Sequence, residues 1–232
     1  MRWTPHRTSS PADPYAAARR AMVERQLRGR GITDERVLAA MTAVRREEFV
    51  SSDFADRAYE DGALPIADGQ SISQPYVVAW MTELLQVDLG MAVLEIGTGS
   101  GYQAAVLAAM GARVRTIERI PALAEAARER LGRLDLGGAV DIVVADGSLG
   151  DPSTAPHERI LVTAGAPTLP GPLLDQLAEG GRLVIPIGAS GDQQMVVVTR
   201  ADGRLVETQV GEVAFVPLIG AAGFRPAADG PV

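Results

Sequence analysis

The strongest constraint on the fold is a regular alternation of strand-like and helix-like segments through the second half of the chain. Segments with the composition of strands occupy 91–95, 113–118, 139–145, 159–163 and 182–187. Segments with helical spacing of apolar residues fall between them, at 101–110, 121–134 and 170–178. Strands that alternate with helices of this length are typical of a parallel sheet covered on both faces. The sequence therefore predicts an α/β fold.

The residues before this region predict helices and one long loop. A helical pattern covers about 14–30, and Thr33 is the predicted N-cap of a second helix. Residues 51–73 are rich in Gly, Pro, Asp and Ser without a clear period. They predict a long ordered loop, and loops of that length in compact domains are usually functional or disordered. A third helix is predicted to open near Ser73, with Pro75 tolerated in its first turn.

The last strand-like segments predict an antiparallel addition to the sheet. Residues 195–199 and 205–210 have the composition of strands, and the Asp202-Gly203 pair between them is typical of a tight turn. These segments predict a hairpin at the edge of the sheet.

Length and flanking composition predict a single domain. A chain of 232 residues is long enough to bury a full α/β core. Residues 1–13 are rich in Pro, Ser and Arg and predict a flexible arm, while 225–232 predict a fraying tail. The domain between them, 14–224, would consist of an N-terminal part, 14–73, and a core with the hairpin, 74–224.

Composition narrows the classes of function. The chain has no cysteine and only two histidines, His6 and His157, which excludes disulfides and thiolate metal sites, and we predict no metal. The formal charge of −7 disfavours nucleic acid as a partner, because binding its backbone needs a positive field. No apolar run reaches the roughly 18 residues of a membrane span, and the basic start lacks the apolar stretch of a secretory signal. We therefore expect a cytoplasmic protein without a membrane partner, and nothing in the sequence indicates more than a monomer.

The sharpest local motif runs from an apolar strand into a helix as Val93-Leu94-Glu95-Ile96-Gly97-Thr98-Gly99-Ser100-Gly101-Tyr102. Glycines let the backbone approach a ligand closely and adopt angles that other residues resist. A dinucleotide fingerprint has the spacing G-x-G-x-x-G, whereas here the third glycine comes one residue early and Tyr102 takes that position. Glu95, just before the loop, would repel a diphosphate and suits a cationic ligand better.

Three acidic residues stand at the ends of three successive predicted strands. Glu95 precedes the glycine loop, Glu118 ends the second strand and Asp146 follows the third. An ammonium group suits Glu95, ribose hydroxyls suit Glu118, and an adenine amino group suits Asp146. Together the three match adenosine joined to an amino acid, which indicates S-adenosylmethionine. Each acid also has a purely structural interpretation. Glu95 is equally explained as a salt-bridged strand end, Glu118 as a solvated strand terminus, and Asp146 as a turn former or N-cap.

Further motifs surround the glycine loop. The most distinctive is Gly69-Gln70-Ser71-Ile72-Ser73-Gln74-Pro75. The others are Ala58-Tyr59-Glu60-Asp61, Leu64-Pro65-Ile66, Ile117-Glu118-Arg119, Ile160-Leu161-Val162-Thr163-Ala164, Gly180-Gly181-Arg182-Leu183-Val184-Ile185-Pro186 and Phe215-Val216-Pro217-Leu218. With these motifs the sequence resembles the protein-L-isoaspartate O-methyltransferase family over roughly Met22 to Phe224. It departs from the family pattern at Ser71, where threonine is more usual, and at His157-Glu158, where Tyr-Asp is common.

The resemblance implies a Rossmann-like class I S-adenosylmethionine-dependent methyltransferase fold, with a seven-stranded, mostly parallel sheet and helices on both faces. It implies methyl transfer from S-adenosylmethionine to the free carboxylate of L-isoaspartyl residues in damaged proteins and peptides, which starts repair through a succinimide and leaves S-adenosylhomocysteine. The 51–73 segment would cover donor and substrate, and Ser73 would be the catalytic residue. The implied donor-binding residues are Ser71, Ile72, Ser73, Gln74, Val78, Glu95, Gly97, Thr98, Gly99, Gly101, Tyr102, Glu118, Arg119, Asp146 and Gly147.

Several of these residues have simpler interpretations. Ser73 also suits the cap of a helix beginning at Gln74, and this is compatible with substrate contact because free N–H groups at a helix start attract anions. Gln70 and Gln74 are equally explained as loop anchors, and the Tyr59-Glu60-Asp61 cluster as a structural turn.

The implied chemistry needs no general base. A carboxylate with a pKa of about 4 is already ionised at neutral pH, so in-line transfer depends on the alignment of the two reactants. Two other functions stay open. One is a peptide-maturation aspartate O-methyltransferase of the same family, and the other is a non-catalytic S-adenosylmethionine-binding module.

Overall fold

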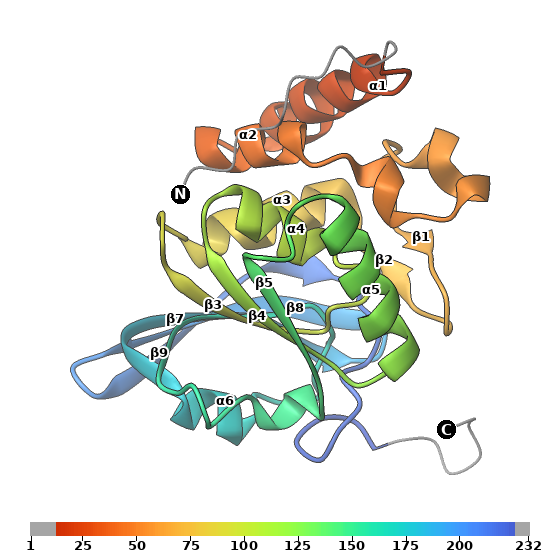
Figure 1. Ribbon diagram of the computed structural model, residues 1–232. Helices are drawn as coiled ribbons and strands as arrows, with labels where there is room; N and C mark the ends of the chain where they lie inside the picture. The colour runs from red at the N-terminus through yellow and green to blue at the C-terminus, as the bar shows by residue number, and fades with distance from the viewer. Residues whose placement is uncertain (1–12, 226–232) are drawn as a thin grey trace.

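A seven-stranded sheet forms the centre of the molecule, in the order β5-β4-β3-β6-β7-β8-β9 (Figure 1). The computed structural model describes residues 13–225. The strands from β5 to β7 run parallel, whereas β8 and β9 are antiparallel additions at one edge. The strands are β3 (Ala92–Ile96), β4 (Arg113–Glu118), β5 (Val140–Val144), β6 (His157–Val162), β7 (Leu177–Ala189), β8 (Asp192–Ala201) and β9 (Arg204–Val213).

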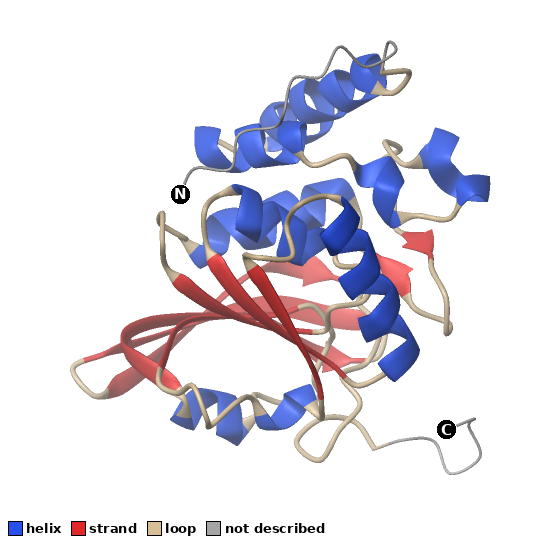
Figure 2. Ribbon diagram, in the orientation of Figure 1, coloured by secondary structure: helices blue, strands red, loops and turns tan. Residues whose placement is uncertain are grey.

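Helices cover both faces of this sheet (Figure 2). On one face lie α3 (Pro75–Leu85), α4 (Tyr102–Ala109) and α5 (Pro121–Arg133), and on the other lies the short α6 (Gly171–Asp175). Of the parallel strands, β3 and β6 are buried over most of their length, as expected for strands covered on both faces, whereas the edge strand β5 is partly exposed. This arrangement confirms the predicted Rossmann-like α/β architecture.

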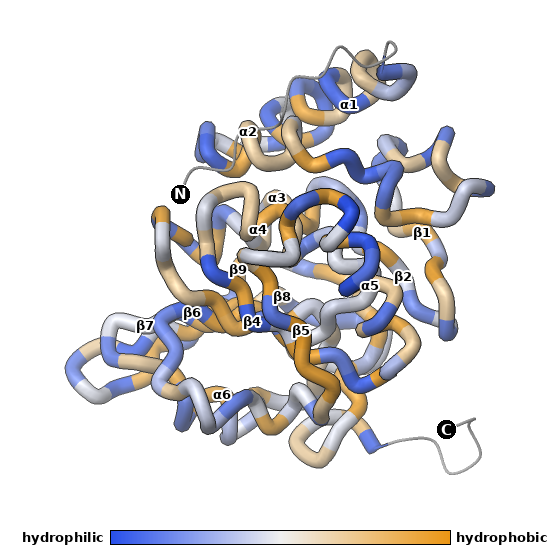
Figure 3. The backbone as a smooth tube through the Cα atoms, in the orientation of Figure 1, coloured by the Kyte–Doolittle hydropathy of each residue, from blue (hydrophilic) through white to orange (hydrophobic). Residues whose placement is uncertain are grey.

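Two hydrophobic clusters fill the space between the layers. Successive residues of one strand point to opposite faces of a sheet. Val93 and Leu161 accordingly belong to the cluster under α3 and α4, whereas their neighbours Leu94 and Ile160 belong to the cluster with Leu173 of α6. The hydropathy colouring shows hydrophobic segments along the central strands (Figure 3). The sheet is thus held by apolar burial on both sides.

The N-terminal segment forms an additional layer above α3 and α4 (Figure 1). It consists of α1 (Ala16–Ala21), a π-helical turn η1 (Met22–Leu27), a 3-10 turn η2 (Arg28–Arg30) and α2 (Glu35–Ala43). The helical stretch ends at Gly31, whose φ of 99° lies in the left-handed region that favours glycine. Met22 and Met41 are fully buried in the same cluster as α4, so this layer is part of the folded core.

The segment predicted as a long loop contains regular structure. A 3-10 turn η3 (Arg46–Phe49) precedes it, η4 (Ser52–Arg57) lies inside it, and β1 (Leu64–Pro65) pairs with β2 (Ser71–Ile72) as a separate antiparallel hairpin. The prediction of a loop without elements is therefore corrected. Paired strands of two residues are too short to show an alternating pattern in sequence.

The hairpin turn explains the composition that suggested a loop. Asp68 and Gly69 have φ values of 56° and 66°, the left-handed conformations that Asp and Gly tolerate in tight hairpin turns. The Ile66 N–H donates to the Gln70 carbonyl at 2.9 Å and closes the turn.

The alternating core matches the prediction closely, with the largest differences at β7 and α6. The helix predicted over 170–178 ends at Asp175, and β7 begins at Leu177 rather than near residue 182. The Gly180-Gly181 pair is typical of a turn in sequence, but here it lies within β7 where the pairing with β6 shifts register. The predicted edge hairpin is confirmed as β8 and β9, with the turn at Asp202-Gly203.

Two predictions of capping residues are wrong, and the predicted helical region over 14–30 is confirmed in extent although its geometry is not uniformly α-helical. Asp34, not Thr33, is the N-cap of α2, because the Arg36 N–H donates to Asp34 Oδ1 at 2.8 Å. Helix α3 begins at Pro75, and its N-cap is Gln74 without a side-chain capping bond, so Ser73 is not a helix cap. The region predicted as one helix over 14–30 changes from α to π to 3-10 geometry along its length.

The predicted arm and tail fall outside the described residues, except for Asp13 and Arg225. Asp13 accepts a hydrogen bond from the Tyr15 N–H at 3.0 Å and pairs with Arg19, so it belongs to the folded part. Within residues 13–225, none of the helices combines the length and the apolar character that crossing a membrane requires.

Candidate active site

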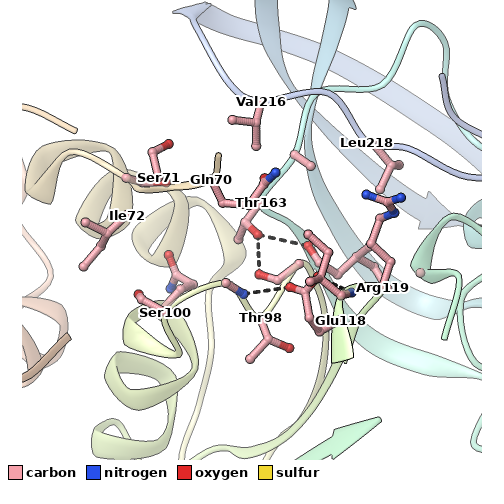
Figure 4. A pocket seen from close by; sticks show the side chains of 18 of the residues that line it. Gln70, Ser71, Ile72, Thr98, Ser100, Glu118, Arg119, Thr163, Val216 and Leu218 are labelled. Carbon is pink, nitrogen blue, oxygen red and sulfur yellow. Dashed lines mark hydrogen bonds between the residues drawn. The ribbon is translucent and has the colours of Figure 1, made fainter. Parts of the chain in front are cut away.

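A pocket opens at the carboxyl ends of β3, β4, β5 and β6 (Figure 4). β3 and β6 are neighbours in the sheet, but the chain continues from β3 to β4 on one side of this pair and from β6 to β7 on the other. Open α/β sheets bind ligands at the point where the strand order reverses in this way. The predicted residues that line this pocket are Ser71, Ile72, Ser73, Val78, Gly97, Thr98, Gly99, Tyr102, Glu118, Arg119 and Gly147. Four predicted residues do not line it: Gln74, Glu95, Gly101 and Asp146.

Glu118 ties the glycine loop to the end of β4. Its carboxylate is buried, and its Oε2 accepts from the Gly99 N–H at 2.9 Å while Oε1 accepts from the Ile120 N–H at 3.0 Å (Figure 4). A carboxylate offers about four lone-pair sites, so acceptor positions remain for a ligand. The geometry suits an acid that accepts hydrogen bonds from two neighbouring hydroxyls.

The glycine loop is shaped to bring backbone, rather than side chains, to the pocket. Gly97 has a φ of 97°, and a Cβ added there would lie 2.5 Å from Thr163 Oγ1. Thr163 has no room to withdraw freely, because its Oγ1 lies 2.7 Å from the Gly97 carbonyl oxygen and 3.0 Å from that of Ile96 (Figure 4). Only glycine fits at position 97.

Gly147 lines the pocket from the end of β5, at the start of the 3-10 turn η5 (Gly147–Leu149). A Cβ on Gly147 would lie 2.6 Å from Ile96 Cγ2. Gly101 has a different role: a Cβ there would meet Ala127 of α5 at 3.4 Å, so this glycine allows close packing of helices rather than ligand contact. The pocket therefore has two glycine-lined walls with no space for side chains.

Two of the predicted residues direct their side chains into the protein. The Tyr102 hydroxyl lies 3.8 Å from Met41 Sδ, and its ring centroid lies 5.3 Å from that of Phe49 in an edge-on contact. Thr98 Oγ1 lies 2.8 Å from Thr116 Oγ1. Both residues line the pocket, but these side chains link the loop to the N-terminal layer and to β4.

The β1–β2 hairpin covers the pocket from the side. Ser71, Ile72 and Ser73 line it, and Ile66 Cδ1 would lie 3.8 Å from a Cβ on Gly99. The hairpin thus lies against the glycine loop, as the sequence predicted for the segment that covers the donor. Because Ser73 makes no capping bond to α3, its hydroxyl is available to a ligand.

Asp146 is used inside the protein. Its Oδ1 accepts from the Ser148 N–H at 3.0 Å and from the Ser148 hydroxyl at 2.7 Å, while Oδ2 accepts from the Ala221 N–H at 2.8 Å. Burial raises the pKa of Asp146, but the bonds from Ala221 and Ser148 outweigh it and leave the pKa below its ordinary value. Asp146 therefore caps η5 and anchors the 219–222 loop beside Gly147; its contact with an adenine amino group stays a prediction.

Glu95 lies beneath the glycine loop, fully buried, and neither carboxylate oxygen has a hydrogen-bond partner among the described residues. Burial raises its pKa to about 8; the Thr116 hydroxyl lowers the pKa, and the nearby charge of Glu118 raises it. An unpartnered buried acid is costly, which fits a carboxyl group whose partner is a bound cation.

This buried acid predicts an unusual pH dependence of stability. In the unfolded chain Glu95 ionises around pH 4.5, whereas in the fold it holds its proton up to about pH 8. Between these values the native state binds more protons than the unfolded state, so the Glu95 contribution to stability falls as pH rises. Relative to Glu95→Gln, the unliganded protein should lose at most about 4 kcal/mol between pH 5 and pH 8, at about 1.4 kcal/mol for each of these pH units.

Urea unfolding of both proteins at the two pH values measures this difference. The glutamine variant corrects for every other titrating group. Parallel pH profiles would show that Glu95 is ionised in the fold.

A second pocket adjoins the first and shares four residues with it, Ser71, Ser73, Thr163 and Val216. Its remaining walls come from α3, the 61–63 loop, Arg30 and the end of β9. Gln74 lines this pocket rather than the first, and its Nε2 donates to Asp61 Oδ1 at 2.7 Å. The shared residues lie between the two pockets.

Comparison with known proteins identifies the family. The family model described as protein-L-isoaspartate(D-aspartate) O-methyltransferase matches residues 17–223. A protein-L-isoaspartate O-methyltransferase from Methanoculleus marisnigri is 51% identical over 214 residues, which cover 92% of this chain and 97% of that protein. The chain belongs to the protein-L-isoaspartate O-methyltransferase family.

Solved structures of this family have the same fold. One protein-L-isoaspartate O-methyltransferase superposes with a TM-score of 0.79 at 31% identity, over 88% of this chain and 67% of the other. A putative protein-L-isoaspartate O-methyltransferase from Plasmodium falciparum, in complex with S-adenosyl-L-homocysteine, superposes with a TM-score of 0.73 at 26% identity, over 85% and 96% of the two chains.

For this member of the protein-L-isoaspartate O-methyltransferase family, sequence interpretation missed one wall of the first pocket. Thr163 and Ala164 line it together with residues 216–219. Both stretches belong to motifs that carried the resemblance, but no role followed from them in sequence. The Gly165 N–H donates to the Val216 carbonyl at 2.8 Å and brings them together. This long-range contact has no local signature.

The described residues contain no group of three or more His, Asp or Glu side chains placed to hold a metal ion. The absence of a metal from the reaction stays a prediction, which activity in the presence of a chelator would test.

Proposed function

We propose that this chain transfers the methyl group of S-adenosylmethionine to the free carboxylate of L-isoaspartyl residues in damaged proteins and peptides, which starts their repair through a succinimide. The observation that carries the proposal is that two pockets adjoin at Ser71, Ser73, Thr163 and Val216. A donor in the glycine-loop pocket and a peptide in its neighbour would meet at these residues. Membership of the family supports both occupants.

The residues of the first pocket fit S-adenosylmethionine. Glu118 has free acceptor positions for ribose hydroxyls, and Gly97 and Gly147 leave room for close backbone contact. Glu95 offers a buried carboxyl group without a partner beneath the loop, which suits the ammonium of the amino-acid moiety, directly or through water. Bound there, the donor supplies a sulfonium methyl group.

The chain itself contributes alignment rather than acid–base chemistry. His157, the histidine within the described residues, begins β6 and lines neither of the two joined pockets. An isoaspartyl carboxylate is ionised at neutral pH and can attack the methyl carbon without a base. In well-oriented systems, alignment supplies roughly 7–11 kcal/mol of the barrier. Ser73 would orient the carboxylate with a single hydrogen bond.

The product explains how methylation leads to repair. In the methyl ester, the backbone nitrogen of the following residue attacks the ester carbonyl carbon and loses its proton. The bond to the methoxy group breaks, and methanol leaves as the succinimide ring closes. Water then opens the ring partly to normal aspartate. Only the first transfer needs the enzyme.

Transfer of a labelled methyl group to an isoaspartyl peptide tests the proposal. We expect the label to enter the peptide and then to appear as methanol, while mass spectrometry detects the succinimide peptide. A chain that binds the donor but labels no isoaspartyl peptide would instead be a binding module.

Replacement of Ser73 tests the alignment role. Ser73→Ala should lower turnover by about 10-fold, the effect of losing one hydrogen bond of roughly 1–1.5 kcal/mol. Donor affinity should change little, and the rate should show no ionisation step near pH 6.5 in either protein, because no histidine base takes part.

Steady-state kinetics and donor titration on the same preparation give these quantities. Ser52→Ala, in the exposed turn η4, is a matched control. Full turnover in Ser73→Ala would remove the substrate contact from Ser73.

The proposal also includes a monomer that acts in the cytoplasm, with proteins and peptides as partners rather than nucleic acid or membranes. The formal charge of −7 supports the exclusion of nucleic acid. Light scattering and sedimentation with and without nucleic acid would test these points.

A further inference from the structure

The second pocket has an aromatic wall that methyl transfer itself does not require. Tyr76 and Trp80, one helical turn apart on α3, line it with Phe215. The Tyr76 and Trp80 rings are stacked with centroids 6.1 Å apart and an interplanar angle of 19°. All three side chains are partly exposed. A peptide in this pocket would lie against aromatic surface.

Polar neighbours hold this wall in place. The Arg30 guanidinium lies over the Tyr76 ring, 3.7 Å from its centroid, and Arg30 Nη1 pairs with Asp61 Oδ2 at 3.0 Å. Asp61 also accepts from Gln74 Nε2. These polar groups bind one another and hold the Tyr76 ring, one face of which Arg30 covers. The aromatic surface open to a ligand is therefore the partly exposed remainder of the wall, which includes Trp80 and Phe215.

Trp80 is fixed from the opposite side by β9. A Cβ added at Gly211 would lie 3.0 Å from Trp80 Cη2, so the strand passes directly against the indole. The next residue, Glu212, is exposed and lines the same pocket. The pocket therefore combines a rigid aromatic wall with a carboxylate at its rim.

We propose that Tyr76 and Trp80 form a subsite for an aromatic side chain that flanks the methylated residue of the substrate peptide, and that Glu212 disfavours an acidic side chain there. This inference rests on the proposed function, since the pocket receives the peptide only if the acceptor carboxylate lies at Ser73. Because the two pockets adjoin at Ser73 and Thr163, a residue that flanks an acceptor bound at Ser73 would lie in the pocket that the rings line.

The chemistry of the wall selects this occupant. A flanking phenyl or indole ring gains offset or edge-on contacts with Tyr76 and Trp80 that alanine lacks. Aromatic pairs of this kind correspond to about 3- to 10-fold in affinity. Of the two carboxylates in the pocket, Asp61 is paired with Arg30, whereas Glu212 forms none of the ion pairs among the described residues. The rim is therefore negative, and it repels an acidic neighbour.

A series of isoaspartyl peptides tests the subsite. Each of the two residues before and the two after the isoaspartate is set in turn to Phe, Ala or Glu, and kcat/KM is measured with saturating donor. At one of these positions we expect Phe to exceed Ala by about 3- to 10-fold, and Glu to fall below Ala. Equal values for all three residues at every position would overturn the inference while leaving the methyltransferase function intact.

Variants assign the preference to named side chains. Trp80→Ala should bring the Phe and Ala peptides to the same kcat/KM, and Trp80→Phe should retain part of the preference. Glu212→Lys should raise kcat/KM for the Glu peptide about 3- to 10-fold relative to the Ala peptide, because it reverses the rim charge. Val206→Ala, exposed on the same strand β9, is the control and should leave every ratio unchanged.

The outcomes distinguish a failure of the subsite from a failure of the proposed function. A Trp80→Phe variant with the wild-type Phe-to-Ala ratio, together with an unchanged Glu ratio in Glu212→Lys, would overturn the subsite. If the wild-type enzyme methylates no isoaspartyl peptide, whatever its flanking residues, the proposed function and the subsite fail together.

Discussion

Gly97→Ala is expected to lower affinity for S-adenosylmethionine by about 100-fold, or close to 3 kcal/mol. Position 97 has a φ of 97°, which costs a residue with a Cβ about 1–2 kcal/mol. The new methyl group would also lie 2.5 Å from Thr163 Oγ1, whose hydrogen bond to the loop carbonyls contributes about 1 kcal/mol. The loop can relieve this overlap only by moving from its position, and the donor pocket is formed by that loop.

A double-mutant cycle separates overlap from backbone strain. Thr163→Ala removes the atom that meets the new methyl group, so Gly97→Ala combined with Thr163→Ala should bind the donor better than Gly97→Ala alone. Gly203→Ala is the matched control, because Gly203 also has a positive φ, of 71°, but no atom lies within 4 Å of its added Cβ. Calorimetric titration of the wild type, the two single variants, the double variant and the Gly203→Ala control gives the affinities. A Gly97→Ala variant with wild-type affinity would remove the close-contact role of the loop.

The alternating core could be predicted from sequence because its pattern is long and repeated. Strands buried on both faces are rich in apolar residues, and the helix at 121–133 shows a 3.6-residue period, with Leu123, Ala124, Ala127 and Leu131 buried. Short elements leave no such periodic pattern. The two-residue strands β1 and β2 and the 3-10 turns are fixed by a turn at Asp68-Gly69 and by packing on other segments.

Site residues could be predicted from the sequence where the chemistry requires a particular residue type at a particular place, such as glycine in a ligand-binding loop or an acid at the end of a strand. Glycines at 97 and 147 and the acid at 118 lie in the pocket, since spacing relative to strand ends places them there. The partners of an acid cannot be read in the same way. Asp146 has its oxygens bonded to Ser148 and Ala221, and the segment around Ala221 is far away in sequence.

The different surroundings of the acidic residues could likewise be seen only in the structure. Glu95 and Glu118 have similar places at predicted strand ends, yet only Glu118 lines the pocket, whereas Glu95 lies under the loop without a partner among the described residues. Thr163 was missed because its importance depends on a 2.7 Å contact with the Gly97 carbonyl. Such contacts follow from the register of β3 and β6, which are separated by 60 residues in the chain and adjacent in the sheet.

An isoaspartyl peptide is expected to be methylated with a kcat/KM at least about 100-fold above that of the matched aspartyl peptide. In an isoaspartyl residue the chain continues through the side-chain carbonyl, so the free carboxylate sits on the α-carbon, one methylene nearer the backbone than in aspartate. In the proposed arrangement the second pocket would hold the flanking peptide, and Ser73, which lines both pockets, would fix where transfer occurs. A misplacement of about 1 Å from that point can cost about 100-fold in rate.

The comparison needs peptides that differ only in this linkage. Labelled methyl transfer to both, at subsaturating concentration with saturating donor, gives the ratio of kcat/KM directly. A Ser73→Ala variant tests the cause: if Ser73 orients the carboxylate, the variant should lose more rate with the isoaspartyl peptide than with the aspartyl one, so that the ratio shrinks. Equal methylation of both peptides by the wild-type enzyme would exclude repair as the function. Strong methylation of a normal aspartate in a single partner peptide would instead indicate a maturation enzyme, because a groove that grips one sequence can present the side-chain carboxylate to the same methyl group.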